Sequence, residues 1–188
     1  MEGKLIIFSA PSGAGKTTVV KELLKTFSNF EFSVSATSRA PRGSEQTGVD
    51  YHFMSNDEFA ERVSRDEFVE WEEVYAGTCY GTLRSELERI WSNGNVILFD
   101  VDVLGGIRLK QIFGEAACSI FVMPPSIETL RKRLVGRGTD AAEVIEKRVN
   151  KAEFEISKSS EFDHVVVNDV LADAVAQTEA IIHNFLES

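Results

Sequence analysis

Cysteine and histidine are both scarce in this sequence of 188 residues. The two cysteines, Cys79 and Cys118, have no partner-like spacing and no histidine companions, so neither a disulfide framework nor a zinc site is indicated. The three histidines, His52, His164 and His183, fall in no arrangement typical of a catalytic site. We therefore interpret each histidine as a structural or surface residue.

Basic residues are also in deficit. The sequence has 20 Lys and Arg against 30 Asp and Glu, a formal net charge of −10. Proteins that bind nucleic acids or membrane surfaces need an extended basic face, and this balance argues against one. We expect no nucleic-acid partner, and we expect any anionic ligand to be bound by local clusters of basic residues.

Long hydrophobic runs are absent. No run approaches the roughly 18 apolar residues of a membrane helix, and the apolar run near the start is too short for a signal peptide. We therefore expect a cytoplasmic protein without a membrane partner. The length, 43% apolar residues, 27% charged residues and the lack of repeats or long linkers indicate one globular domain.

The stretch from residue 5 to residue 18 carries the clearest chemical pattern. An apolar run, Leu5 to Phe8, predicts a buried strand, a glycine loop follows, and apolar residues then recur at helical spacing. The loop resembles the phosphate-binding pattern G-x-x-x-x-G-K-[ST]. The residues predicted to bind a nucleoside triphosphate here, which the resemblance described below makes ATP, are Ala10, Pro11, Ser12, Gly13, Ala14, Gly15, Lys16, Thr17 and Thr18.

Each part of this loop has a physical role in binding a phosphate. Backbone N–H groups of residues 13–17 and the helix N-terminus face the anion, Lys16 adds a full positive charge, and the Thr17 hydroxyl can ligate Mg²⁺. Ala10 stands where the pattern has its first glycine, which is harmless only if its φ is negative. The alternative is a glycine loop that merely joins a strand to a helix.

Two later segments complete the candidate machinery. The apolar run 96–100 ends in Asp100 and predicts a buried strand that delivers a carboxylate beside the magnesium site; the alternative is a turn or helix cap. Basic residues cluster at 131–148, where glycines flank Arg137 between two predicted helices. This favours a mobile lid, although a solvated charged face is the usual interpretation of such clusters and is the one we adopt for Lys132 and Lys147.

The remaining pattern alternates strands with helices, which predicts a parallel sheet covered by helices. From the breaker-rich loop 37–43 to about Leu87 the composition becomes rich in aromatic and acidic residues, which indicates an inserted subdomain. Further strands are expected at 32–35, 51–54, 68–74, 119–123 and 164–167, and helices after Ser55, at 83–92, after Ser126, after Asp140 and at 171–185.

The type of reaction follows from what surrounds the loop. The guanine motif Asn-Lys-x-Asp of GTPases is absent, since residues 168–170 lack the lysine. A phosphate acceptor is already largely ionised at neutral pH, so a kinase acting on one needs no general base. This agrees with the lack of a catalytic histidine.

Nine motifs occur in a characteristic order over essentially the whole chain. They are residues 10–17, 33–42, 48–51, 68–71, 80–82, 100–102, 124–126, 136–138 and 168–169. Together they resemble the guanylate kinase family. The resemblance implies a three-layer α/β P-loop kinase fold and ATP- and Mg²⁺-dependent phosphorylation of GMP and dGMP, a step of purine nucleotide metabolism. It divides the chain into a core (1–35, 93–125 and 159–188), an inserted mixed α+β monophosphate-binding region (about 36–92) and a helical lid (about 126–158).

The resemblance also assigns roles to single residues. It places Arg39, Arg42, Tyr51 and Tyr80 at the GMP phosphate, Ser35, Glu70, Thr82 and Asp102 at guanine, Lys16, Arg137 and Arg148 at the transferred phosphoryl group, and Arg133 and Asn168 on the adenine side of ATP. Guanine presents adjacent N1–H and N2–H₂ donors, which suit a carboxylate such as Glu70, whereas adenine has an acceptor at N1. Leu104 and an extra glycine within 102–106, and a longer segment at 75–79, depart from the usual family pattern.

Two rival functions stay open at this point. One is a kinase for another monophosphate such as AMP or dTMP, against which Glu70 and Asp102 argue because two acceptors suit the donor-rich guanine edge. The other is a non-catalytic module of guanylate kinase-like fold. The intact Gly13, Gly15 and Lys16 argue against it, since such modules typically have degraded phosphate loops.

Overall fold

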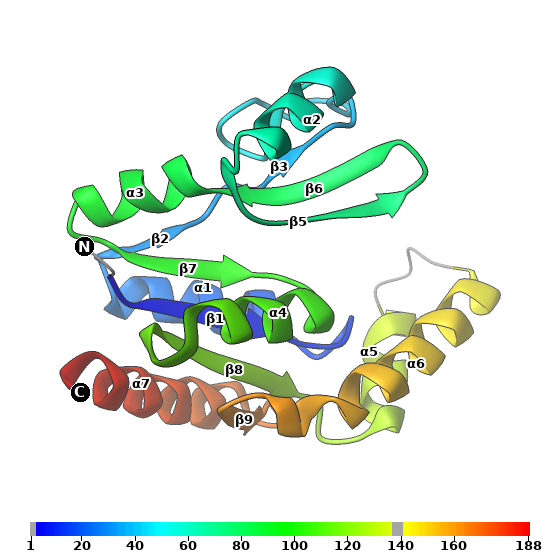
Figure 1. Ribbon diagram of the computed structural model, residues 1–188. Helices are drawn as coiled ribbons and strands as arrows, with labels where there is room; N and C mark the ends of the chain where they lie inside the picture. Colours follow the sequence, from blue (N-terminus) through cyan, green and yellow to red (C-terminus); the bar gives the residue numbers. More distant parts are fainter. Residues whose placement is uncertain (1–2, 137–140) are drawn as a thin grey trace. The chain divides into compact units, whose positions relative to one another are not determined.

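The protein is described by a computed structural model that covers residues 3–136 and 141–188 (Figure 1). Contacts within the chain divide it into two compact units. The middle unit is Glu31–Ile97, and the flanking unit comprises the chain up to Phe30 together with Leu98–Ser188. In the described part of the chain, no helix is long and apolar enough to cross a bilayer.

The flanking unit contains most of the helices. Its elements are β1 (Leu5–Ser9), α1 (Lys16–Thr26), α4 (Val103–Phe113), η1 (Gly114–Ala116), β8 (Ala117–Met123), α5 (Ile127–Gly136), α6 (Ala142–Ser157), η2 (Ser159–Glu161), β9 (His164–Val167) and α7 (Leu171–Glu187). Strands β2 (Phe30–Phe32) and β7 (Val96–Asp100) lie where the sequence passes from one unit to the other.

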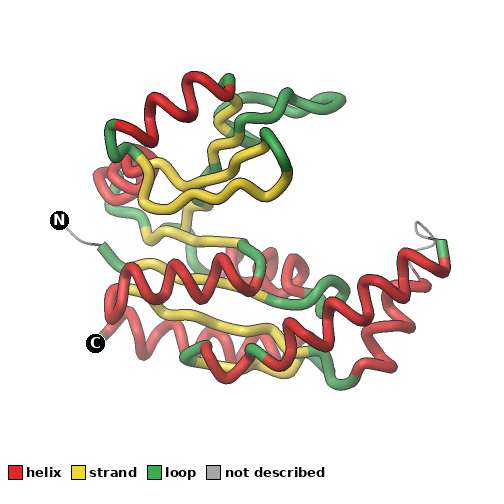
Figure 2. The backbone as a smooth tube through the Cα atoms, turned by 45° about the vertical axis from the view of Figure 1, so that its right-hand side comes forward, coloured by secondary structure: helices red, strands yellow, loops and turns green. Residues whose placement is uncertain are grey.

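The larger of the two sheets has five strands in the order β2-β7-β1-β8-β9. The pairs β1–β8 and β8–β9 are parallel, with Leu5 opposite Ala117 and Ile120 opposite His164. Figures 1 and 2 show α4 on one face of this sheet and α1 and α7 on the other. Every residue of β1 is buried because helices cover both faces, which is why the strand is a continuous apolar run. The predicted helix-covered parallel sheet is confirmed.

The middle unit has its own sheet and its own small core. Its elements are β3 (Ala36–Thr37), β4 (His52–Phe53), α2 (Asn56–Ser64), β5 (Phe68–Tyr75), β6 (Thr78–Leu83) and α3 (Arg84–Ser92). The strand order is β4-β3-β6-β5, with β3–β4 parallel and the other pairs antiparallel. Ala36, Phe68 and Leu83 are buried together with Phe59 of α2.

Two helix starts follow the sequence prediction. Ser55 Oγ accepts a hydrogen bond from the backbone N–H of Glu58 (3.1 Å) at the start of α2. Ser126 Oγ likewise accepts from the N–H of Thr129 (3.0 Å) at the start of α5. Serine hydroxyls here satisfy backbone donors that the first helical turn leaves without partners. Asp140, the predicted cap of the next helix, lies outside the described residues; α6 follows Ala141.

The strand predicted at 32–35 is wrong. The chain instead forms β2, which ends at Phe32, and then β3, which begins at Ala36. Between them the backbone N–H of Val34 donates to the buried carboxylate of Glu86 (3.0 Å). A side chain therefore takes a hydrogen bond that a strand would have given to its neighbour. The strand expected at 51–54 is shorter in the structure, as β4.

Helix α4 was not predicted, because two consecutive glycines are poor helix formers. The structure gives Gly106 a packing reason: a Cβ there would lie 2.3 Å from Ser9 Oγ of β1. The glycine lets α4 approach the sheet closely. Leu104, which also departs from the usual family pattern, is 52% exposed and so contributes little to the core.

Candidate active site

The phosphate loop joins the buried strand β1 to the start of α1. Gly13 (φ 96°) and Gly15 (φ 94°) have left-handed backbone conformations, which glycine adopts without strain. Among the residues that the structure describes, Asp66 is the one non-glycine residue with positive φ. The backbone at Ala10 is therefore not left-handed, and alanine is tolerated where the pattern has its first glycine.

Lys16 and Asp100 lie together at the end of the sheet that carries this loop. The Lys16 ammonium group forms an ion pair with the Asp100 carboxylate and donates to the backbone carbonyl of Val101 (2.8 Å). The side chains are 17% and 32% exposed. The strand β7 thus delivers Asp100 to the loop lysine. The capping role considered for Asp100 falls instead to Asp102, whose Oδ1 accepts from the Gly105 N–H (2.8 Å) at the start of α4.

Arg133 and Asn168 contact the loop from α5 and from the segment after β9. Asn168 Nδ2 (2.8 Å) and Arg133 Nη1 (3.2 Å) both donate to the carbonyl of Ala14, and Arg133 Nη2 donates to the carbonyl of Asn168 (2.9 Å). A pocket of about 320 Å³ opens beside them. It is lined by Gly13, Gly15, Thr18, Arg133, Asn168, Asp169 and Leu171.

Arg148, predicted to act on the transferred phosphoryl group, also lies at the loop. It projects from α6, and its Nη1 donates to the Ser12 hydroxyl (3.1 Å). Helix α6 packs on α5 through a small apolar core that includes Leu134 and Val149. Arg137, the third predicted cation, lies outside the described residues.

The middle unit gathers three of the residues predicted for the GMP phosphate. Arg39 Nε donates to the Tyr80 hydroxyl (3.2 Å), and the guanidinium carbon lies 4.9 Å from the centre of the Tyr51 ring. The Tyr51 and Tyr80 rings meet edge to face at 5.9 Å. The Arg42 side chain is exposed, and Arg42 joins this cluster through its backbone N–H, which donates to Glu45 (2.8 Å).

The predicted guanine-side residues divide between the units. Glu70 of β5 stands opposite Thr82 of β6, and the buried Thr82 hydroxyl donates to Glu70 Oε1 (2.8 Å). Ser35 lies directly before β3 in the same unit, where its carbonyl accepts from the His52 N–H (2.8 Å). Asp102 belongs to the flanking unit.

Sequence reasoning does not single out Glu45, which the structure places at the centre of the arginine cluster. Its carboxylate accepts from both terminal nitrogens of Arg39, Nη1 (2.6 Å) and Nη2 (2.8 Å). These hydrogen bonds, with a further one from the Arg42 N–H, lower the pKa of Glu45 to about 2. The one signal in the sequence that could have indicated Glu45 is its position, three residues after Arg42 in a loop with two arginines.

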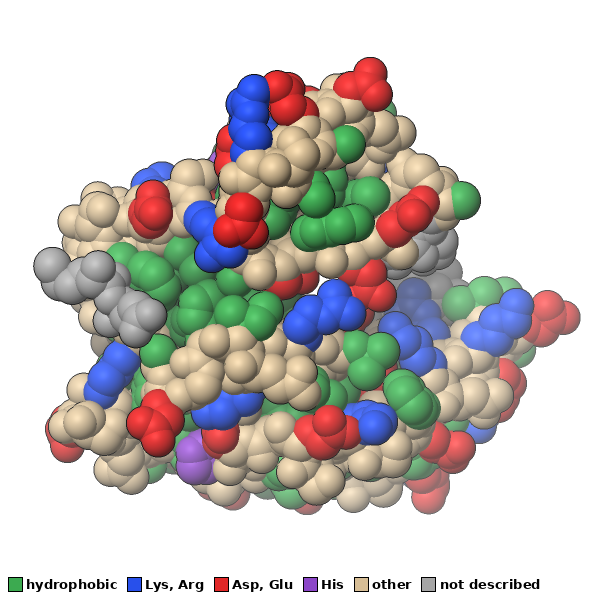
Figure 3. Space-filling view, in the orientation of Figure 1, with side chains coloured by type: hydrophobic (Ala, Val, Ile, Leu, Met, Phe, Trp, Pro, Cys, Tyr) green, Lys and Arg blue, Asp and Glu red, His purple; other side chains and the backbone are tan. Residues whose placement is uncertain are grey.

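The surface of the protein is mixed in charge. On the face shown in Figure 3, acidic and basic side chains are interspersed rather than segregated. Lys16 at the phosphate loop and Arg39 in the middle unit each provide local positive charge for an anion.

A parallel sheet covered by helices, with a glycine loop and a lysine-initiated helix after its central strand, defines the class: a P-loop kinase fold. The family model described as guanylate kinase matches residues 2–185. The chain belongs to the guanylate kinase family.

Individual relatives agree with this assignment. The chain is 53% identical over 186 residues to a guanylate kinase of Bacteroides thetaiotaomicron, covering 99% of this chain and 91% of that protein. It is 52% identical over 184 residues to one from Porphyromonas gingivalis, covering 97% and 98%. The crystal structure of guanylate kinase from Anaplasma phagocytophilum matches with a TM-score of 0.72 at 32% identity, covering 99% of this chain and 87% of that one.

Proposed function

We propose that this protein is a cytoplasmic enzyme of purine nucleotide metabolism that transfers the terminal phosphoryl group of ATP to GMP, and to dGMP. The observation that carries the choice of acceptor lies in the middle unit. This unit holds an arginine–tyrosine cluster suited to a phosphate and a carboxylate–hydroxyl pair suited to guanine. The family of the chain supports the same assignment.

ATP binds at the phosphate loop. Backbone N–H groups of residues 13–17 and the N-terminus of α1 receive its phosphates, with Lys16 as the full positive charge. The pocket beside Arg133 and Asn168 takes the adenine side of the nucleotide. Because both residues also bond to the Ala14 carbonyl, nucleotide contacts there are coupled to the shape of the loop.

GMP binds through two sets of groups. Arg39, Arg42, Tyr51 and Tyr80 hold its phosphate by charge-assisted hydrogen bonds, which are among the strongest in proteins. Glu70 accepts from the guanine N1–H and N2–H₂ donors. The Thr82 hydroxyl fixes the Glu70 carboxylate in place (2.8 Å). Ser35 and Asp102 complete the proposed guanine-side residues.

Transfer itself depends on positioning and on positive charge. The acceptor phosphate is already ionised, so no side chain has to remove a proton. Lys16, Arg137 and Arg148 stabilise the charge on the transferred group. Arg148 already contacts the loop through Ser12. We propose that the helices α5 and α6 act as a lid that excludes water and so prevents hydrolysis of ATP.

The residues beside the loop suit a magnesium ion. Mg²⁺ prefers oxygen ligands and is usually bound by one or two protein groups together with substrate phosphates. The Thr17 hydroxyl in the first turn of α1 and the Asp100 carboxylate at the end of β7 are such groups. A bound Mg²⁺ neutralises charge on the phosphates, and Lys16 orients the Asp100 carboxylate toward the same loop.

The loop chemistry is tested by ADP formation from ATP and GMP. We expect chelation with EDTA to abolish turnover and excess Mg²⁺ to restore it. We expect Lys16→Met to lower kcat by about 100-fold or more, because it removes a donor aimed at developing charge. Lys25→Met, at the exposed far end of the same helix, is the matched control and should leave kcat unchanged. Turnover that persists in EDTA, or a Lys16→Met enzyme as active as the control, would contradict this assignment.

A further inference from the structure

The Arg39 guanidinium already donates hydrogen bonds to a carboxylate along one of its edges. A guanidinium carries five N–H donors in a rigid planar fork. Glu45 accepts from both Nη1 (2.6 Å) and Nη2 (2.8 Å), so its carboxylate lies across the end of the fork. The carbonyl of Ala40 takes a further donor of Nη1 (3.0 Å).

The other edge of the fork, formed by Nε and the second N–H of Nη2, points toward Tyr80. Nε donates to the Tyr80 hydroxyl (3.2 Å). The guanidinium also lies over two aromatic rings, with its carbon 4.9 Å from the centre of Tyr51 and 5.4 Å from that of Phe53. Its plane and its end are thus both fixed, and the Arg39 side chain is only 11% exposed. What remains for an anion is the second N–H of Nη2, beside the Tyr80 hydroxyl, which accepts from Nε and so keeps its own O–H to donate.

Glu45 also orders the loop that carries the second arginine. Its carboxylate accepts from the backbone N–H of Arg42 (2.8 Å), and its own N–H donates to the Arg42 carbonyl (3.1 Å). One carboxylate therefore ties the side chain of Arg39 to the backbone of Arg42. Removal of this carboxylate would release both together.

We propose that Glu45 is a positioning residue for the acceptor: it holds Arg39 so that the remaining N–H of Nη2, together with the Tyr80 O–H, receives the phosphate of GMP. The inference rests on the proposed function. Glu45 does not contact GMP in this account, and it acts through Arg39 and Arg42. Recognition of a phosphate by two donors, here the Nη2 N–H and the Tyr80 O–H, needs such a fixed orientation, because the geometry of the donors provides the specificity.

Glu45 has two opposing effects on the affinity for GMP: it orients Arg39, and its negative charge repels the phosphate. A carboxylate beside Arg39 offsets part of the positive charge that the phosphate meets, so a Glu45 that merely competed with GMP would weaken its binding. The Arg39 guanidinium is packed against two rings and a carboxylate, which favours the orienting effect of Glu45 over its repulsion of the phosphate. Without these contacts, Arg39 would lose more side-chain entropy on binding GMP. The two roles predict opposite changes when the charge of Glu45 is removed.

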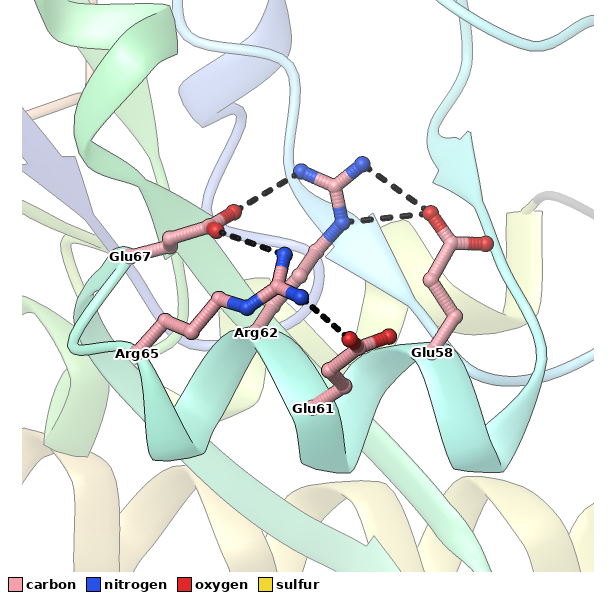
Figure 4. A pocket seen from close by; sticks show the side chains of 5 residues that line it. All are labelled: Glu58, Glu61, Arg62, Arg65 and Glu67. Atoms are coloured by element: carbon pink, nitrogen blue, oxygen red, sulfur yellow. Dashed lines mark hydrogen bonds and ion pairs between the residues drawn. The ribbon is translucent and has the colours of Figure 1, made fainter.

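The test compares Glu45→Gln and Glu45→Asp with a matched pair elsewhere in the same unit. On α2, Glu58 accepts from Nε (3.1 Å) and Nη2 (3.0 Å) of Arg62, and Figure 4 shows this arginine held between Glu58 and Glu67 at the surface. Glu58→Gln thus breaks the same kind of arginine–carboxylate pair away from the residues proposed to bind GMP. For each variant, kcat, KM for GMP, KM for ATP, the dissociation constant of GMP by calorimetry and the melting temperature are measured.

We expect Glu45→Gln to raise both KM and the dissociation constant for GMP by about 10-fold, with KM for ATP unchanged, since charge-assisted hydrogen bonds are lost at one substrate only. Glu45→Asp, which keeps the charge but shortens its reach, should show a smaller rise. Glu58→Gln should change neither constant. Should Glu45→Gln melt below the assay temperature, the Asp variant provides the same comparison.

Three results would overturn the inference. The first is a lower KM for GMP in Glu45→Gln, which would show that Glu45 competes with GMP. The second is a KM for GMP equal to that of the unchanged protein. The third is an equal rise in KM for GMP and in KM for ATP. Failure of the proposed function looks different. In that case the unchanged protein itself would not turn GMP over, while the dissociation constants for GMP would still report whether Glu45 orients Arg39.

Discussion

At the scale of single residues, the proposed preference for guanine depends on which groups would face the base. Glu70 offers only acceptors when it is ionised, and guanine offers adjacent donors at N1 and N2. The Thr82 hydroxyl, itself buried, donates to Glu70 Oε1 and so leaves the carboxylate little freedom to rotate. A buried polar group that loses its partner is costly, which makes such a pair selective.

Glu70→Gln tests this role. The amide can still accept from Thr82, but its NH₂ group would face the donors of guanine. We expect kcat/KM for GMP to fall by about 100-fold or more, within the range by which a hydrogen-bonding site rejects a mismatched partner, and KM for ATP to stay nearly constant. Steady-state kinetics with each substrate varied in turn measures both. Equal losses for GMP and ATP would show that Glu70 does not bind the base.

At residue level, a local pattern predicts where a side chain lies in the fold. Asp100 was expected beside the phosphate loop, because a buried parallel strand ends in that carboxylate, and in the structure it forms an ion pair with Lys16 of the loop. Glu45 could not be found in this way. Its contact with Arg39 depends on the conformation of a loop of irregular structure, where no periodicity indicates which side chains meet.

At the scale of elements, the loop between β1 and α1 is held from the side by Asn168. A Cβ on Gly15 would lie 2.3 Å from Asn168 Nδ2, and the backbone there is left-handed (φ 94°). Glycine is required at this position for its conformation and for its lack of volume. The same Asn168 nitrogen donates to Ala14, so displacement of the side chain would also remove a loop contact.

Gly15→Ala should therefore affect the loop and its ligand together. We expect a loss of about 1 to 3 kcal/mol of folding free energy from strain and a clear rise in KM for ATP. Gly94→Ala is the matched control, because Gly94 also has positive φ (75°) but a Cβ there meets nothing within 4 Å. Denaturant unfolding and ATP kinetics separate the two contributions. If both variants leave KM for ATP unchanged, the contact with Asn168 does not shape the nucleotide site.

Elements were predictable from the sequence when their own residues determine them. The run Leu5–Ser9 forms β1 because every residue is buried between helices, and the serine-capped α2 and α5 begin where the capping residues indicate. Elements fixed by distant contacts were missed. The expected strand at 32–35 is interrupted by the hydrogen bond to Glu86, and Gly106 in α4 allows that helix to pack closely on Ser9.

At the scale of the whole molecule, the alternation of strands and helices was enough to predict the main sheet, since parallel strands need crossover helices that cover both faces. The sheet of the middle unit was harder. Its strands β3 and β4 have two residues each and pair in parallel, although β3 pairs antiparallel with β6. Strands this short carry no pattern of their own, so only the packing of Phe59 and Phe68 against them reveals the arrangement.

The most direct measurement for the whole molecule is ADP formation from ATP and Mg²⁺ in one coupled assay, with GMP, dGMP, AMP, dTMP or no acceptor. We predict rapid turnover with GMP, turnover with dGMP, and only background with AMP, dTMP or no acceptor, because we propose that Glu70 and Thr82 select guanine while the Arg39–Tyr80 cluster binds the acceptor phosphate. Turnover with AMP or dTMP equal to that with GMP would show that the guanine-side residues are misassigned. Silence under every condition would contradict the enzyme assignment itself.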